Sequence, residues 1–284
     1  MPRGAPGFWQ HRGLPALGLL PLSVLFAGVA GLRRFLFNVG ILRVERLPVP
    51  VIVVGNIAVG GSGKTPIALW LAEILRAAGY TPGIVSRGYG GSVEGVAAVD
   101  PEGDPARFGD EPVLMARRSG CPVFVGRDRP AAGRALLAAH PRVNVLIADD
   151  GLQHLRLQRD LEIELLDDER KYGNGLIIPA GPLREKPRSC DFKVSNGGLE
   201  DDIDTHHYGM QLIYANAETL DAGAYRDLSE FADDKVYAIA GIGHPERFFN
   251  ALKARGLNIN PLAFPDHHDY SRADFPVDAP VLMT

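Results

Sequence analysis

Short runs of apolar residues alternate along the chain with stretches that repeat apolar residues every three or four positions. The first pattern is typical of buried strands and the second of helices that cover a sheet. Strand-like runs occupy 51–54, 83–86, 121–125, 143–148, 161–166 and 236–241, and helical stretches occupy 66–78, 131–140 and 245–255. Regular alternation of this kind predicts an α/β fold with a doubly wound parallel sheet.

The alternation weakens in the second half of the chain. It fades after residue 185, passes through a polar run at 200–204 and restarts at Val236. We therefore expect a second, smaller α/β domain, with the functional site in the cleft between the two domains.

The first strand-like run leads into a glycine-rich turn that opens a helix. The turn reads Gly60-Gly61-Ser62-Gly63-Lys64-Thr65. Its glycines let the backbone turn tightly and aim N–H groups at an anion, and the dipole of the following helix adds positive potential. Lys64 is expected to reach the β- and γ-phosphates of a nucleotide, and the Thr65 hydroxyl to hold Mg²⁺. This predicts a P-loop NTPase-type domain, although Ala58 stands where the usual pattern G-x-x-x-x-G-K-S/T has its first glycine. A glycine-rich turn without a ligand is the alternative.

A second candidate metal ligand ends the strand-like run at 143–148, which is followed by Asp149 and Asp150. In P-loop enzymes an Asp at such a strand end supports Mg²⁺, and ligands of open α/β sheets gather at the carboxyl ends of strands. Adjacent side chains of an extended chain point to opposite faces. We therefore expect one carboxylate to face the metal, Asp149 before Asp150. Two solvated acids are the alternative.

The residues after this pair, Gly151-Leu152-Gln153-His154, together with the glycine-rich turn, resemble the tetraacyldisaccharide 4′-kinases of lipid A synthesis. Further pieces of the resemblance follow in the same order along the chain: Ser86-Arg87-Gly88-Tyr89-Gly90, Gly109-Asp110-Glu111-Pro112, Gly173-Asn174-Gly175, Pro179-Ala180-Gly181-Pro182-Leu183-Arg184-Glu185 and Asp266-His267. The resemblance implies transfer of the ATP γ-phosphate to the 4′-hydroxyl of a tetraacylated disaccharide 1-phosphate, giving lipid IVA, with ATP and Mg²⁺ as cofactors.

Asp110 is the candidate acceptor for the proton of that hydroxyl. A free carboxylate is a weak base near neutrality, so a partner that tunes it is expected, and the resemblance implies His267. Two plainer interpretations stay open. Asp110 would also suit the N-terminal cap of a helix that includes Val113, and His267 would suit a solvated turn or, with His268, a metal cluster.

The resemblance also assigns the remaining site residues. It places Gln153 at the metal with Thr65, Asp149 and Asp150. It implies that the substrate is bound by Arg87, Glu111, His154, Asn174 and Arg184. Arg127 and Arg129 are further candidates for a phosphate clamp, because the planar fork of arginine suits phosphate oxygens, and ordinary surface charge is the alternative.

The N-terminal segment is apolar enough to meet a membrane. No charged residue occurs from Leu14 to Leu32, and the flanking arginines are Arg3, Arg12, Arg33, Arg34, Arg43 and Arg46. About 20 apolar residues span a bilayer as a helix, but Pro15 and Pro21 weaken that interpretation. A cleaved signal peptide is a further interpretation, but export would place an ATP-dependent phosphate loop outside the cell. We expect shallow insertion at the cytoplasmic face of the inner membrane, monotopic or peripheral, with arginines on anionic headgroups and aromatic residues in the lipid: Trp9, Phe26, Phe35 and Phe37.

Composition limits the other functions. The 284 residues carry a net charge of −4 and two distant cysteines, Cys121 and Cys190. This argues against a general nucleic-acid binder, a disulfide framework and a zinc site, and it suits a reducing cytosol. The open alternatives are an ATPase switch that docks on the membrane and a membrane-tethered binding module without catalysis.

We divide the chain into a membrane-associated helical segment at 1–46, a P-loop nucleotide-binding domain at 47–170, and a linker with the smaller α/β domain at 171–284. The last residues, 280–284, form a strand-like run that the resembling proteins continue. We expect either a fragment or an unfinished sheet at that point. We expect an acylated disaccharide lipid and an anionic membrane surface as partners, and no obligate protein partner.

Overall fold

The computed structural model describes residues 6–197, 206–214, 216–220, 223–265 and 268–284. Contacts between Cα atoms divide it into two compact units. The larger unit is Gly7–Gln211, and the smaller one contains Leu212–Thr284.

The larger unit is built on one sheet with the strand order β3-β4-β2-β5-β1-β6-β7-β8. Every neighbouring pair is parallel except β3 with β4. The strands are β1 Val51–Gly55, β2 Pro82–Ser86, β3 Val96–Ala98, β4 Val123–Gly126, β5 Val145–Asp149, β6 Leu161–Asp167, β7 Phe192–Asn196 and β8 His207–Met210. The predicted doubly wound α/β fold is confirmed.

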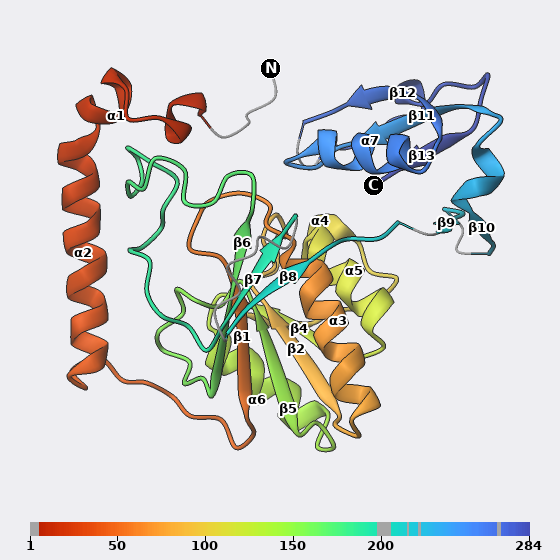
Figure 1. Cartoon of the computed structure of the whole chain (residues 1–284). Helices are drawn as coiled ribbons and strands as arrows, with labels where there is room; N and C mark the ends of the chain where they lie inside the picture. The colour runs from red at the N-terminus through yellow and green to blue at the C-terminus, as the bar shows by residue number, and fades with distance from the viewer. Residues whose placement is uncertain (1–5, 198–205, 215, 221–222, 266–267) are drawn as a thin grey trace. The chain divides into compact units, whose positions relative to one another are not determined.

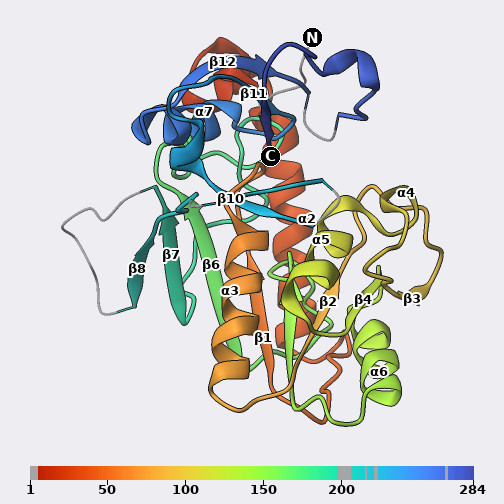
Figure 2. The same ribbon diagram turned by 90° about the vertical axis from the view of Figure 1, so that its right-hand side faces the viewer.

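Helices cover both faces of this sheet, because the side chains of each strand alternate between the faces. Ile52 and Val54 of β1 belong to the core under α3 (Lys64–Ala77) and α5 (Asp110–Ser119). Val51 and Val53 belong to the core under α6 (Arg129–Ala139). A short helix, α4 (Pro105–Phe108), leads into α5. Figures 1 and 2 show α3 and α5 on one side of the sheet.

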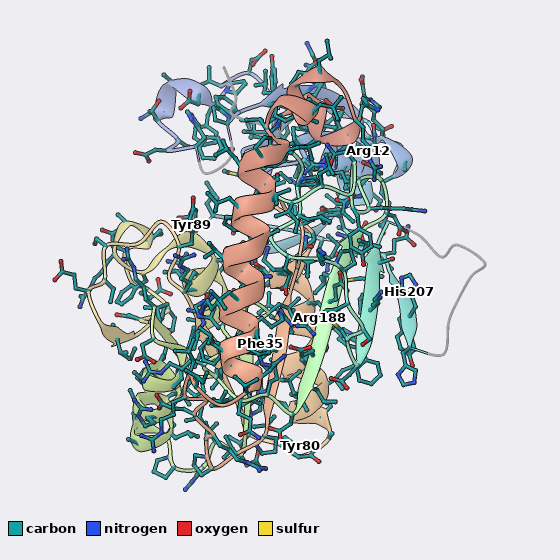
Figure 3. The ribbon with its side chains drawn as sticks, turned by 90° about the vertical axis from the view of Figure 1, so that its left-hand side faces the viewer. Arg12, Phe35, Tyr80, Tyr89, Arg188 and His207 are labelled. Carbon is teal, nitrogen blue, oxygen red and sulfur yellow. The ribbon has the colours of Figure 1, made fainter. Side chains whose placement is uncertain are left out.

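The N-terminal segment forms η1 (Gly7–Gln10), α1 (Leu14–Gly18) and α2 (Leu20–Asn38). Figures 1 and 2 place α2 on the side of the sheet opposite α3. Ser23 is the only buried residue of α2. Among the described residues, α2 is the one helix that is long and apolar enough to cross a membrane. Figure 3 looks onto its exposed face, with Phe35 labelled near its end.

The smaller unit has its own core around a parallel sheet of order β12-β11-β13. Its elements are β9 Asn216–Glu218, β10 Tyr225–Asp227, η2 Leu228–Phe231, β11 Lys235–Ala240, α7 Pro245–Ala254, β12 Asn258–Ala263, η3 Arg272–Asp274 and β13 Val281–Met283. Strands β9 and β10 form a separate antiparallel pair. A smaller α/β unit is therefore present, as the sequence predicts.

The boundary between the two units falls between Gln211 and Leu212, whereas the sequence predicts a domain boundary between residues 170 and 171. Strands β7 and β8 lie beyond residue 170 but pair with β6 and with each other, so they extend the large sheet. The sequence pattern is weak there because β8, the edge strand, reads His-Tyr-Gly-Met and is largely exposed. An edge strand needs less apolar sequence than a central one.

Candidate active site

The phosphate loop joins β1 to α3, as predicted. Gly63 is the N-cap of α3 with φ 89°, a left-handed conformation that glycine adopts without strain. A Cβ atom at Gly63 would lie 2.7 Å from the side-chain nitrogen of Asn196. Lys64 and Thr65 are the first two helical residues, so the loop presents the unpaired N–H groups of a helix start beside a cation.

Two buried oxygens at this place have no hydrogen-bond partner within the part of the chain that the structure describes. They are Oγ of Ser62 in the loop and Oδ1 of Asp149 at the end of β5. The sheet register pairs Val54 with Asp149, so Asp149 lies at the carboxyl ends of the central strands, where the phosphate loop begins. Buried polar atoms normally have partners, and a ligand explains a pair of unpartnered oxygens.

Asp149 is held in a position that disfavours its charge. Its Oδ2 accepts a hydrogen bond of 3.0 Å from the Ser86 hydroxyl. Burial and the negative charges of Glu111 and Asp150 together raise the pKa of Asp149 to about 6, against the opposing effect of Lys64. A carboxylate whose charge is disfavoured in this way gains from a cation.

Asp150 has the opposite electrostatic setting. Arg184 Nη1 lies 3.0 and 3.1 Å from its two carboxylate oxygens, and Lys64 Nζ lies 3.9 Å from Oδ1. Burial would raise the pKa of Asp150, but Lys64 and Arg184 together outweigh it and lower the pKa. Its φ of 46° is left-handed, and β5 ends at Asp149. The expectation that the two residues form an extended pair is therefore wrong, and the charge of Lys64 acts on both carboxylates.

The donor set fits Mg²⁺. Thr65, Asp149 and Asp150 offer hard oxygen atoms, and Mg²⁺ usually takes one or two carboxylates together with substrate phosphates. Among the described residues no group of three or more His, Cys, Asp or Glu could hold a metal by itself. Gln153 is engaged elsewhere: its amide group contacts Arg184, Glu185 and the Asn56 carbonyl. Its role at the metal stays a prediction.

Three further predicted residues share the electrostatic field of the aspartates. Burial, together with the charges of Arg129 and Arg87, lowers the pKa of His154 to about 4, so the imidazole is neutral at pH 7. Arg129 is fully buried and donates to the carbonyls of Gly126 (2.7 Å) and Asp149 (3.0 Å). Arg129 therefore holds the ends of β4 and β5 together, and Arg87 and His154 are the groups beside it.

The predicted acidic pair, Asp110 and Glu111, forms the start of α5. Gly109 is the N-cap and Asp110 the first helical residue, so Asp110 is not itself the capping residue. Glu111 follows, and its charge acts on Asp149. His267 lies outside the described residues, so its pairing with Asp110 stays a prediction.

Asn174 makes contacts that the sequence does not suggest. Its side-chain nitrogen donates to the carbonyls of Phe8, His11 and Ala180, and its oxygen accepts from the Leu176 amide. These bonds tie its loop to the N-terminal segment. A role for Asn174 in binding the substrate stays a prediction.

Two residues without a predicted role, Ser86 and Asn196, also touch the site. Ser86 is the last residue of β2, and its hydroxyl donates to Asp149. Asn196 is the last residue of β7, and its side-chain nitrogen donates to the Ser62 carbonyl at 3.2 Å. Their positions in the sequence could have indicated this. Both are polar residues at the carboxyl end of a strand, and in a parallel sheet these ends lie together where ligands bind.

Comparison with known proteins agrees with this geometry. A family model described as Tetraacyldisaccharide-1-P 4'-kinase matches residues 15–281. The chain belongs to this family. It is 52% identical to the tetraacyldisaccharide 4'-kinase of Aromatoleum aromaticum, over 100% of this chain and 87% of that relative. It is 50% identical to that of Azoarcus sp. (strain BH72), over 99% and 84%.

A solved member of the tetraacyldisaccharide 4'-kinase family has a similar structure. It is LpxK from Aquifex aeolicus, described as the "apo" form in complex with ATP. The TM-score is 0.80 at 31% sequence identity, and the match covers 95% of this chain and 88% of the other. The similarity therefore includes the large sheet that carries the phosphate loop.

Proposed function

We propose that this chain transfers the γ-phosphate of ATP to the 4′-hydroxyl of tetraacyldisaccharide 1-phosphate, a step of lipid A biosynthesis that gives lipid IVA. The observation that supports this most is the pair of unpartnered buried oxygens, on Ser62 and Asp149, beside Lys64 in a chain of this kinase family. The cofactors are ATP and Mg²⁺.

The chain's own residues supply positioning and charge. The loop amides from Gly60 to Lys64 cradle the phosphates, and the Lys64 ammonium stabilises the charge on the group in transfer. Thr65 and Asp149 would hold Mg²⁺, with Asp150 beside them. The ion would supply positive charge that offsets the charge of the phosphates.

The acceptor hydroxyl needs a base. We assign this role to Asp110, with His267 as the partner that tunes it. Support comes from the place of Asp110, at the start of α5 and next to Glu111, whose charge acts on Asp149. Arg87, His154 and Arg184 are the candidates for contacts with the anionic acceptor.

The substrate carries four acyl chains, and α2 offers a surface on which the enzyme can meet it. Most of α2 is exposed although it is apolar, including Leu25, Val29 and Phe35. An exposed apolar patch of this kind marks an interaction site. We assign it to shallow insertion into the cytoplasmic face of the inner membrane, with Arg33 at anionic headgroups.

Incubation with labelled ATP, Mg²⁺ and the acceptor in detergent micelles tests the proposal. The expected product is a lipid heavier by one phosphate, which tandem mass spectrometry locates on the distal sugar. Label that appears only as inorganic phosphate, whether or not the lipid is present, would support the ATPase switch and overturn the kinase proposal.

A further inference from the structure

The loop formed by residues 174–185, called the connecting loop below, contacts the N-terminal helices at one end. Ser23, the buried residue of α2, donates from its hydroxyl to the Ile177 carbonyl and accepts from the Ala180 amide at 3.1 Å. The indole nitrogen of Trp9 donates to the Pro179 carbonyl at 3.0 Å. The membrane-facing helix is therefore attached to this loop by hydrogen bonds away from its exposed face.

The other end of the connecting loop contacts the phosphate loop through backbone bonds. The Val59 amide donates to the Pro182 carbonyl at 2.8 Å, and the Arg184 amide donates to the Ile57 carbonyl at 2.7 Å. Val59 directly precedes Gly60. A shift of the connecting loop would therefore move the backbone that enters the phosphate loop.

A second path between α2 and the site runs through side chains. Arg34 of α2 forms an ion pair with Glu185, whose side chain is 10% exposed. Glu185 accepts from Gln153 Nε2 at 2.9 Å, and Gln153 Oε1 accepts from Arg184 at 3.3 Å.

Arg184 completes this path, because it binds the Asp150 carboxylate that lies beside Lys64. Four polar side chains thus link a helix residue to the lysine of the phosphate loop. Networks of charged hydrogen bonds in a partly buried site act as a unit, since each group orients the next.

Loss of Arg34 would disturb this path for an electrostatic reason. Glu185 is almost buried, and removal of one partner of such a pair leaves an uncompensated charge. Arg188 Nε lies 3.7 Å from Oε2 of Glu185, the oxygen that pairs with Arg34, and would draw the carboxylate toward itself. Gln153 and Arg184 would then lose the geometry that keeps Asp150 against Lys64.

We propose, on the basis of the proposed kinase function, that Arg34 and Ser23 are positioning residues for phosphoryl transfer. The helix that meets the membrane also supports the active site through the connecting loop. The rate of transfer then depends on how α2 is attached, even when the acceptor is offered in micelles and no membrane has to be found.

The test compares full-length variants with micellar acceptor at saturating ATP, with kcat expressed per ATP-binding site. Coupling of this kind predicts that Arg34→Ala and Ser23→Ala each lower kcat by about threefold to thirtyfold, while the KM for acceptor stays within about twofold. Arg34→Lys keeps the charge and should recover kcat to within about threefold of wild type. Arg142→Ala, an exposed arginine just before β5, should change nothing.

The outcomes separate the two proposals. If wild type phosphorylates the lipid and both Arg34→Ala and Ser23→Ala keep its kcat, α2 is an anchor alone and the inference is overturned. An equal loss of kcat in Arg142→Ala overturns it as well. If wild type makes no phosphorylated lipid, the kinase function itself has failed. Should Arg34→Ala not fold, Ser23→Ala and Arg34→Lys decide.

Discussion

Helices α2 and α3 are both rich in apolar residues, and the structure uses them in opposite ways. In α3 the apolar residues form one stripe, and Ile67, Ala68, Leu71 and Ala72 are buried against the sheet. In α2 they surround the helix, and Leu25 is 65% exposed whereas Leu71 is 9% exposed. A helix that is apolar all round needs surroundings other than water.

The difference shows how one chain serves two surroundings. Packing of α3 fixes Lys64 and Thr65 at its first turn, so burial there supports chemistry. Most of the apolar surface of α2 is not buried by the fold, and this surface is available for a lipid interface.

The largest effect is expected at the first residue of α3. Lys64→Ala removes the cation beside the group in transfer, and loss of one such group typically costs about a hundredfold to a thousandfold in kcat or more. Steady-state kinase rates measure this loss. Glu73→Ala, an exposed change on the same helix, is the control. A folded Lys64→Ala protein with a near wild-type rate would show that the loop does not bind the transferred phosphate.

A matched pair of leucines separates the two helices by stability. Leu71→Ala in α3 removes buried volume and should lower the free energy of unfolding by about 2–5 kcal/mol. Leu25→Ala in α2 should change it by less than about 0.5 kcal/mol, because that side chain is already exposed. Urea unfolding in the absence of lipid measures both. Equal destabilisation by the two changes would mean that α2 packs against the protein.

The two aspartates beside α3 predict opposite responses to neutralisation. The pKa of Asp149 is raised to about 6, against about 3.9 in an unfolded chain. Folding stability therefore falls as pH rises from about 4 to about 6, and the ionised carboxylate stays unfavourable above that range. Asp149→Asn should stabilise the ligand-free protein near pH 8 by on the order of 2 kcal/mol and have little effect near pH 4.

Asp150→Asn is the control for that experiment. Because Lys64 and Arg184 lower the pKa of Asp150, its charge contributes stability above the ordinary pKa, and neutralisation should destabilise the protein near pH 8. Urea unfolding in a chelator compares the two variants. If both changes destabilised the protein, the electrostatic contrast between these neighbours would be disproved.

The sequence was sufficient where local pattern and structure coincide. The apolar run before Gly60 and the stripe after Lys64 predict β1, the phosphate loop and α3, because burial of both faces and helix periodicity leave a direct trace in residue type. The order of strands and helices likewise predicts the doubly wound sheet. The end of β5 at Asp149 was located to within one residue.

Features that depend on distant contacts left no such trace. The left-handed backbone of Asp150 accompanies its contacts with Lys64 and Arg184, residues far from it in sequence. Asn174 is occupied by carbonyls of the N-terminal segment, which no local pattern reveals. The connecting loop has the turn-forming residues of an ordinary surface loop, and only its partners at both ends distinguish it.

The ratio of two rates tests most directly whether α2 and α3 have the separate roles assigned here. The rates are those of lipid phosphorylation with the acceptor in anionic vesicles and in detergent micelles. Leu25→Asp places a charge on the exposed face of α2, and Val277→Asp, at a residue 93% exposed in the smaller unit, is the control. Because burial of a leucine is worth about 1.5–3 kcal/mol, Leu25→Asp should lower the vesicle rate by about tenfold or more and leave the micelle rate near wild type. An unchanged vesicle rate, or an equal fall in both rates, would contradict the account.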